Sequence, residues 1–183
     1  MYQVTAALPA LRNILIPLIP KLIAANAASR DELIQVVSEL TAEVQEGLSL
    51  VATYIRGAAY LETKEEIGKH FFEAETKLYR YHSEFKIFQG IRRVRDRFTR
   101  MFDALPRAVE MGERQQIEML LSELQLDESM ILAEFGAFWP RVHELLQARP
   151  LAEAKAAIQA ELTDINQKKQ LIGTVANEIL QTF

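Results

Sequence analysis

The sequence predicts an all-α protein: an elongated up-down bundle of four long helices, preceded by a proline-kinked apolar helical segment. Turns depend on glycine and proline, and seven glycines and six prolines in 183 residues indicate few, long elements. Apolar residues recur at alternating steps of three and four over most of the chain. We expect a single domain, residues 1–183, made of the apolar segment 1–28 and the bundle 29–183.

The N-terminal segment is apolar but too interrupted to cross a membrane. Between residues 4 and 28 its charges are Arg12 and Lys21, and Pro17 and Pro20 divide the apolar run. A spanning helix needs about 20 consecutive apolar residues, and the first residues lack the basic cluster of a signal peptide. We therefore expect a kinked helix, or two short ones, that caps the bundle or lies in one of its grooves.

The first bundle helix is predicted from residue 29 to about residue 61. Ser29 and Glu32 have the spacing of a capping box, in which each side chain satisfies a free backbone donor of the first turn. A coiled-coil-like seam follows, with one polar member: Ile34, Val37, Thr41, Val44, Leu48, Val51, Ile55 and Ala58.

A second capping box, Thr63 to Glu66, opens the next helix. We expect this helix to reach Ala104, because Pro106 disfavours helical conformation in the residue before it. Such a helix would be about 60 Å long, which implies an elongated bundle. Its seam changes phase beside Gly90: Phe71, Ala74, Leu78, Tyr81, Phe85 and Phe88, then Ile91, Val94, Phe98, Met101 and Leu105.

Two further helices complete the predicted bundle. The first runs from about 113 to 149, with a kink or break expected at Trp139-Pro140, because a proline ring clashes with the preceding turn. Its seam is Ile117, Leu121, Leu124, Glu128, Ile131, Phe135, Phe138, Val142 and Leu145. The second runs from 151 to 181, and its seam is Ala154, Ile158, Leu162, Ile165, Ile172, Ala176 and Ile179.

The sequence lacks the parts of common catalytic and metal sites, so we expect neither an enzyme nor a cofactor. None of its histidines has the Glu-x-x-His spacing of di-iron bundles, and there is no cysteine. Glu66, His70 and Glu73 share one helix face, but they lie beside the seam, and a solvated flank is the better interpretation. Glycine-rich phosphate loops and nucleophile elbows do not stand out.

One acidic residue, Glu128, falls on the predicted seam of the fourth helix. A carboxylate there costs stability unless it is paired or neutralised, and perturbed carboxylates gather at functional sites. The alternative is a local helix irregularity that lets the carboxylate reach water. We favour this alternative.

Charge is segregated along the chain. Residues 77–107 carry nine Lys or Arg against three acids, a balance of +6 that leaves −10 elsewhere. Basic and aromatic residues together suit anionic lipid or nucleic acid. Most of these aromatics lie on the seam, however, and the acidic stretches 31–46 and 113–134 can pair with the basic helix, within one chain or between copies. We favour such pairing over an anionic membrane surface and expect no nucleic-acid partner. The candidate contact residues are Lys86, Arg92, Arg93, Arg95, Arg97 and Arg100.

These observations predict a non-enzymatic, cytoplasmic helical-bundle module for protein interaction, scaffolding or regulation, which self-associates or docks a protein partner. The alternative is a bundle at the membrane periphery, whose apolar N-terminal segment inserts into lipid while the basic helix contacts anionic headgroups. The candidate residues for insertion into lipid or a partner are Leu15, Ile16, Leu18, Ile19 and Leu22.

Overall fold

The computed structural model describes two continuous ranges, residues 28–83 and 138–183. It also describes a set of single positions: 12, 13, 16, 17, 19–21, 24, 93, 96, 97, 99, 100, 112, 115 and 119. The elements formed by these residues are helical, and none of the described residues lies in a strand. This confirms the predicted all-α class.

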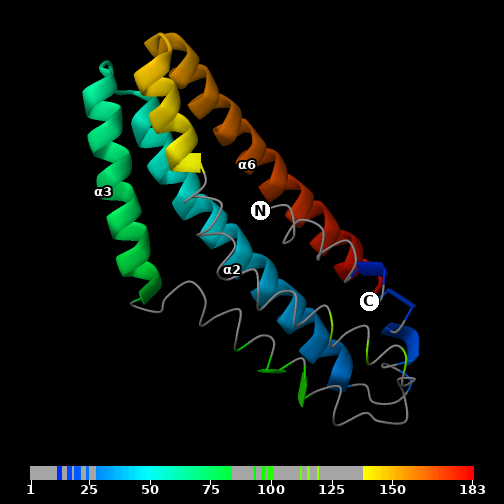
Figure 1. Cartoon of the computed structure of the whole chain (residues 1–183). Helices are drawn as coiled ribbons and strands as arrows, with labels where there is room; N and C mark the ends of the chain where they lie inside the picture. Colours follow the sequence, from blue (N-terminus) through cyan, green and yellow to red (C-terminus); the bar gives the residue numbers. More distant parts are fainter. Residues whose placement is uncertain are drawn as a thin grey trace.

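The two longest described helices, α2 (Ala28–Ala59) and α6 (Leu151–Leu180), pack side by side and antiparallel (Figure 1). Near the start of α2, Arg30 donates a hydrogen bond to the backbone oxygen of Phe183 at 3.1 Å. In mid-helix, the Nε2 of Gln45 donates to the carbonyl of Lys169 at 3.4 Å. This pair forms the largest part of the core, because its facing aliphatic side chains are almost completely removed from water.

On α6 the buried face follows the predicted seam. All seven predicted residues are buried, and Val175 joins them: Ala154, Ile158, Leu162, Ile165, Ile172, Val175, Ala176 and Ile179. The helix begins after Pro150, which has the extended backbone of a residue just outside a helix. The predicted end at residue 181 agrees with the observed last helical residue, Leu180, to within one position.

On α2 the buried face is wider than one seam. The predicted seam residues Val37, Val44, Leu48, Val51, Ile55 and Ala58 are buried. Ile34 and Thr41 are only half-buried, and Leu33, Val36 and Leu40 are buried beside them. The hydroxyl of Thr41 donates to the carbonyl of Val37 at 2.7 Å, so its polarity is satisfied within the helix. The helix begins at Ala28, one residue before the predicted cap.

The next helix, α3 (Lys64–Ser83), runs antiparallel to α2 at the edge of the molecule (Figure 1). The predicted capping box is confirmed, since the backbone N–H of Glu66 donates to the Thr63 hydroxyl at 3.1 Å and the Glu66 carboxylate accepts from the Thr63 N–H at 3.0 Å. Ile67, Phe71 and Ala74 form a narrow buried stripe toward the core.

Residues 138–148 form a further helical stretch, which we call the 138–148 helix, and it runs antiparallel to α3. At one end the ammonium of Lys64 donates to the Arg149 carbonyl at 2.7 Å. At the other end the Phe71 ring stacks on Trp139 at 5.3 Å between ring centroids and meets the edge of Phe138 at 5.7 Å. Trp139 and Pro140 are helical, and the residues from 120 to 137 that would show the predicted kink lie outside the described part.

Some described positions of the N-terminal segment contact the helices. Ile19 is fully buried and belongs to the common core. Arg12 forms an ion pair with Glu178 of α6 at 2.7 Å, while Pro17 and Pro20 are exposed. The predicted continuations of the third helix to 104 and of the fourth helix from 113 to 137 fall largely outside the described residues. Within the part of the chain that is described, no helix is both long and apolar enough to span a bilayer.

Candidate interaction surface

One arginine of the basic segment, residues 77–107, bonds to the face of α2 that carries Glu39 and Glu43. Arg97 places its Nη1 2.7 Å from the carboxylate of Glu39 and its Nη2 2.9 Å from the amide oxygen of Gln35. The side chain of Arg97 is 25% exposed and that of Glu39 is 39% exposed. Pairing within one chain, one of the two forms of pairing that the charge pattern predicts, is therefore present at this point.

The same face of α2 holds a crowded carboxyl group. Burial raises the pKa of Glu43 above its ordinary value, and the neighbouring carboxylates of Glu46 and Glu39 raise it further. Arg93 acts in the opposite direction and lowers the pKa. The acidic face of α2 thus depends on the basic segment for part of its charge balance.

Of the other candidate residues, Arg100, Ile16 and Ile19 lie among the described positions. Arg100 is exposed and donates from Nε to the carbonyl of Asp96, four residues earlier, at 3.2 Å. Ile16 is half-buried and Ile19 fully buried, so the described part of the insertion set faces the protein. The remaining candidates lie outside the described residues: Lys86, Arg92, Arg95, Leu15, Leu18, Leu22 and Glu128.

Glu66, His70 and Glu73 each have their own partner. Glu66 accepts hydrogen bonds at the start of α3, and Glu73 lies 4.0 Å from the ammonium of Lys77. The Nε2 of His70 lies 2.7 Å from the carbonyl of Tyr54, so this half-buried imidazole packs on α2. It is not on a solvated flank as predicted. Across the described ranges, no three His, Asp or Glu side chains are grouped to hold a metal ion.

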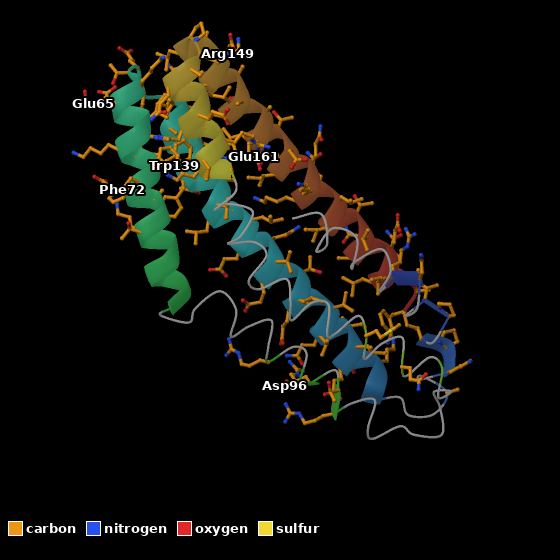
Figure 2. All side chains as sticks on the ribbon, in the orientation of Figure 1. Glu65, Phe72, Asp96, Trp139, Arg149 and Glu161 are labelled. Atoms are coloured by element: carbon orange, nitrogen blue, oxygen red, sulfur yellow. The ribbon has the colours of Figure 1, made fainter. Side chains whose placement is uncertain are left out.

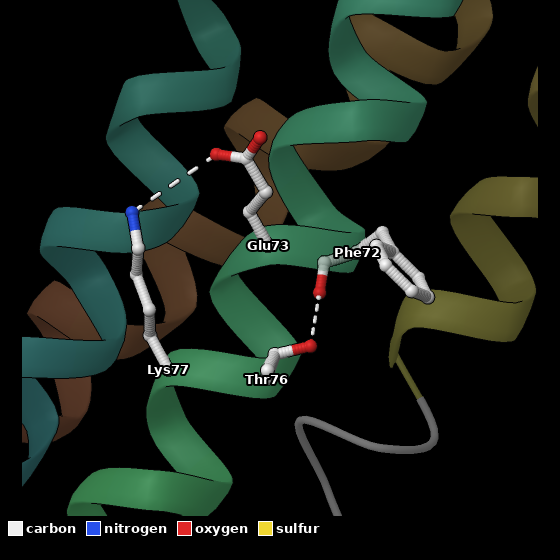
Figure 3. A pocket seen from close by; sticks show the side chains of 4 residues that line it. All are labelled: Phe72, Glu73, Thr76 and Lys77. Atoms are coloured by element: carbon white, nitrogen blue, oxygen red, sulfur yellow. Dashed lines mark hydrogen bonds and ion pairs between the residues drawn. The ribbon is translucent and has the colours of Figure 1, made fainter.

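The outer face of α3 carries the most exposed phenylalanine of the described helices. Phe72 is 66% exposed, although its neighbour Phe71 is completely buried. In Figure 2 the Phe72 side chain lies on α3, the helix at the edge of the molecule. Beside it is an open hollow of about 280 Å³, lined by Phe72, Glu73, Thr76 and Lys77 (Figure 3). The Thr76 hydroxyl donates to the Phe72 carbonyl at 3.0 Å, so it is already bonded within α3.

One turn before Phe72, the helix has a glycine. A β-carbon built on Gly68 would meet no heavy atom within 4 Å, so the surface is open above this residue, and the Phe72 ring does not cover it. On either side of Gly68 in the sequence, Lys64 contacts Arg149 and Phe71 stacks on Trp139. The open position above Gly68, which we call the notch, is one helical turn from the exposed Phe72 ring.

A row of alternating charges runs along α3 next to this notch. Its four members follow one another at steps of four and are all exposed: Glu65, Lys69, Glu73 and Lys77. Residues at this spacing form one ridge on a helix surface. The Glu73–Lys77 pair, with side chains 51% and 64% exposed, is held only loosely.

This surface was not among the sequence-predicted sites, although the sequence contains its signals. Phe71 and Phe72 are adjacent, and adjacent residues point about 100° apart on a helix, so both cannot lie on one seam. A glycine inside a long amphipathic helix is also a signal of a special role, since it costs about 1 kcal/mol of helix stability relative to alanine. The sequence pattern alone does not show whether another helix of the chain covers Phe72, because that depends on how the helices pack.

Comparison with known proteins gives no relative: neither a protein-family model, nor a curated protein, nor a solved structure matches this chain.

Proposed function

We propose that this chain is a non-enzymatic helical interaction module that self-associates, built on an elongated up-down bundle of four long helices. The observation that carries this proposal is Phe72, a large apolar side chain that is 66% exposed in a helix whose opposite face is packed. Burying a phenylalanine side chain contributes about 1.5–3 kcal/mol, so a surface that covers Phe72 gains binding energy. Aromatic anchors of this kind are enriched at the centres of protein interfaces.

The charge distribution supports the same proposal. Arg97 is paired with Glu39 and Arg12 with Glu178 within the chain. This pairing argues against a purely electrostatic partner such as nucleic acid. The four charges of the row on α3 balance each other, because Glu65 and Glu73 alternate with Lys69 and Lys77. A balanced row beside an apolar anchor suits a protein surface.

Sedimentation velocity of the full chain from micromolar to millimolar concentration tests the proposal. A reversible, concentration-dependent increase in the sedimentation coefficient is expected, because mass action populates the oligomer. A chain that remains monomeric over the whole range would show that self-association is not its function.

The second candidate function is engagement of an anionic membrane by the N-terminal segment. One observation favours it: the ion pair between Arg12 and Glu178 is partly exposed, at 33% and 45%, and so forms a weak latch on this apolar segment. Flotation of the full chain with anionic and neutral liposomes at low salt tests this candidate. Binding to anionic vesicles alone is expected, and Arg12→Gln should increase it by loosening the latch. A chain that stays unbound with both vesicle types rules this candidate out.

A further inference from the structure

We infer that a second copy of this chain docks antiparallel on α3, with Phe72 of each copy seated in the notch above Gly68 of the other. This inference rests on the proposed self-association and specifies the surface and symmetry of the contact. It is carried by three independent features of α3: the exposed ring, the uncovered glycine and the alternating charge row.

The glycine is the first argument. Glycine inside a helix is less stable than alanine, so it is expected where the backbone must approach something closely. Among the residues that the structure describes, none comes close to the missing side chain, because a β-carbon added to Gly68 would meet no heavy atom within 4 Å. The missing side chain therefore leaves room for a residue from another molecule.

The spacing of Phe72 and Gly68 is the second argument. They lie four residues apart on one ridge of α3, so both face the same side of the helix. A two-fold axis that passes close to residue 70 makes two copies of α3 antiparallel and exchanges these positions. Phe72 of the first copy then meets Gly68 of the second, and Gly68 of the first meets Phe72 of the second. This reciprocity is the property of an isologous interface.

The charge row is the third argument, and it points to the same partner. Read in one direction, Glu65, Lys69, Glu73 and Lys77 alternate negative and positive; read in reverse, every sign is inverted. An antiparallel copy therefore brings Glu65 opposite Lys77 of the second copy and Lys69 opposite Glu73 of the second copy. All four contacts across the axis are attractive, whereas a parallel copy in register would place like charges together.

The position of α3 makes this contact sterically feasible. It lies at the edge of the molecule (Figure 1). Its buried stripe is Ile67, Phe71 and Ala74, and Phe72 lies outside this stripe. The loose Glu73–Lys77 pair, 4.0 Å apart, can exchange partners at little cost.

Gly68→Ala gives a test in which stability and association move in opposite directions. In the dilute monomer this variant should raise Tm by about 2–4 °C, because alanine is the better helix former and its β-carbon meets open space. The same β-carbon fills the notch, so the dimer dissociation constant should rise at least about tenfold. Phe72→Ala should raise it similarly. Leu171→Ala, which removes a 45%-exposed side chain from α6, is the matched control and should change neither value.

A charge exchange then tests whether the charge rows of the two copies face each other. Lys69→Glu/Lys77→Glu makes the row entirely acidic, and Glu65→Lys/Glu73→Lys makes it entirely basic. Each double variant alone should lose self-association at low salt, and an equimolar mixture should recover it as a heterodimer. Circular dichroism on each variant confirms that α3 remains helical.

The outcomes separate this inference from the function on which it rests. A wild-type chain that is monomeric at millimolar concentration overturns both. A wild-type chain that associates while the Gly68, Phe72 and charge variants associate equally well overturns the α3 interface and leaves self-association standing. Recovery of association by the mixture alone establishes that the charge rows of the two copies face each other.

Discussion

The imidazole of His70 occupies the space beside Gly57 that any other residue would need for its side chain. A β-carbon on Gly57 would lie 2.7 Å from Cε1 and 3.0 Å from Nε2 of His70, closer than such atoms approach. The same Nε2 lies 2.7 Å from the carbonyl of Tyr54 on α2. The absence of a side chain at position 57 therefore allows α3 to lie against α2 through a half-buried polar contact.

Gly57→Ala is expected to destabilise the fold by about 1–3 kcal/mol, because the His70 ring must move and the hydrogen bond to Tyr54 is strained or lost. Urea unfolding followed by circular dichroism measures the change. His70→Ala in the same chain should recover much of the loss, since it removes the clash, so the two substitutions are expected to be non-additive. If the free energies lost in the two single variants simply added in the double variant, the steric relationship between Gly57 and His70 would be contradicted.

The ion pair between Arg97 and Glu39 should contribute a measurable coupling energy. For a partly exposed pair we expect about 0.2–1 kcal/mol from a double-mutant cycle of Arg97→Ala and Glu39→Ala in urea unfolding. The value should fall at high salt because the pair is partly solvated. Arg100→Ala with Glu39→Ala is the control cycle, since Arg100 bonds to the Asp96 carbonyl, and its coupling should be close to zero.

Glu43→Gln should stabilise the protein slightly at neutral pH. The folded-state pKa of Glu43 is raised, mainly by burial, so its ionised form is disfavoured by folding once the pH exceeds that pKa. Removing the charge should give only a small rise in Tm at pH 7, because Glu43 is half-buried and its charge is screened by solvent. Below the ordinary carboxyl value of 4.5 the gain should disappear, because Glu43 is then protonated in both states. A constant difference in Tm across this pH range would contradict the assignment.

Glu66→Gln should have the opposite pH dependence. Hydrogen bonds from the Thr63 hydroxyl and from the backbone of Thr63 and Glu62 lower the pKa of Glu66 in the folded chain. The contribution of Glu66 to stability is complete above pH 4.5, the ordinary carboxyl pKa. It is lost as the pH falls through the lowered folded-state pKa. The variant should therefore melt below the wild type at pH 7 and together with it in strong acid. Glu65→Gln, in the same first turn, controls for the general effect of removing a negative charge there.

Ile19→Ala should show that the N-terminal segment contributes to the core. Ile19 is fully buried, and replacing such a side chain with alanine costs about 2–5 kcal/mol. Ile16→Ala, at a half-buried position of the same segment, should cost less. If both substitutions left the urea midpoint unchanged, the segment would not be packed on the bundle in solution.

The helices could be predicted from the sequence where each has one main neighbour. On α6 all seven predicted residues from Ala154 to Ile179 are buried, because one regular apolar stripe faces one large contact. On α2 the prediction missed Leu33, Val36 and Leu40, because residues of this helix contact more than one partner, and its buried face is wider than one seam. The spacing of apolar residues predicts which face of a helix is buried, but not how many other elements pack on that face.

The site was harder to predict than the helices because it depends on what lies opposite each residue. The Thr63–Glu66 capping box is local in sequence and could be predicted in full. The roles of Gly57 and Gly68 could not, because one is filled by His70 from another helix and the other is open. Both are glycines in helices, and only packing distinguishes them.

The pairing of α2 with α6 has a consequence for the order in which this protein folds. Its contacts join residues far apart in the chain, such as Gln45 with Lys169 and Arg30 with Phe183. Such contacts close large loops, which slows folding compared with helical proteins whose neighbours are adjacent in sequence. During synthesis, the apolar face of α2 cannot meet its main partner until residues 151–180 have emerged from the ribosome. Until then, α3 is the nearest helix in the sequence that can shield part of that face.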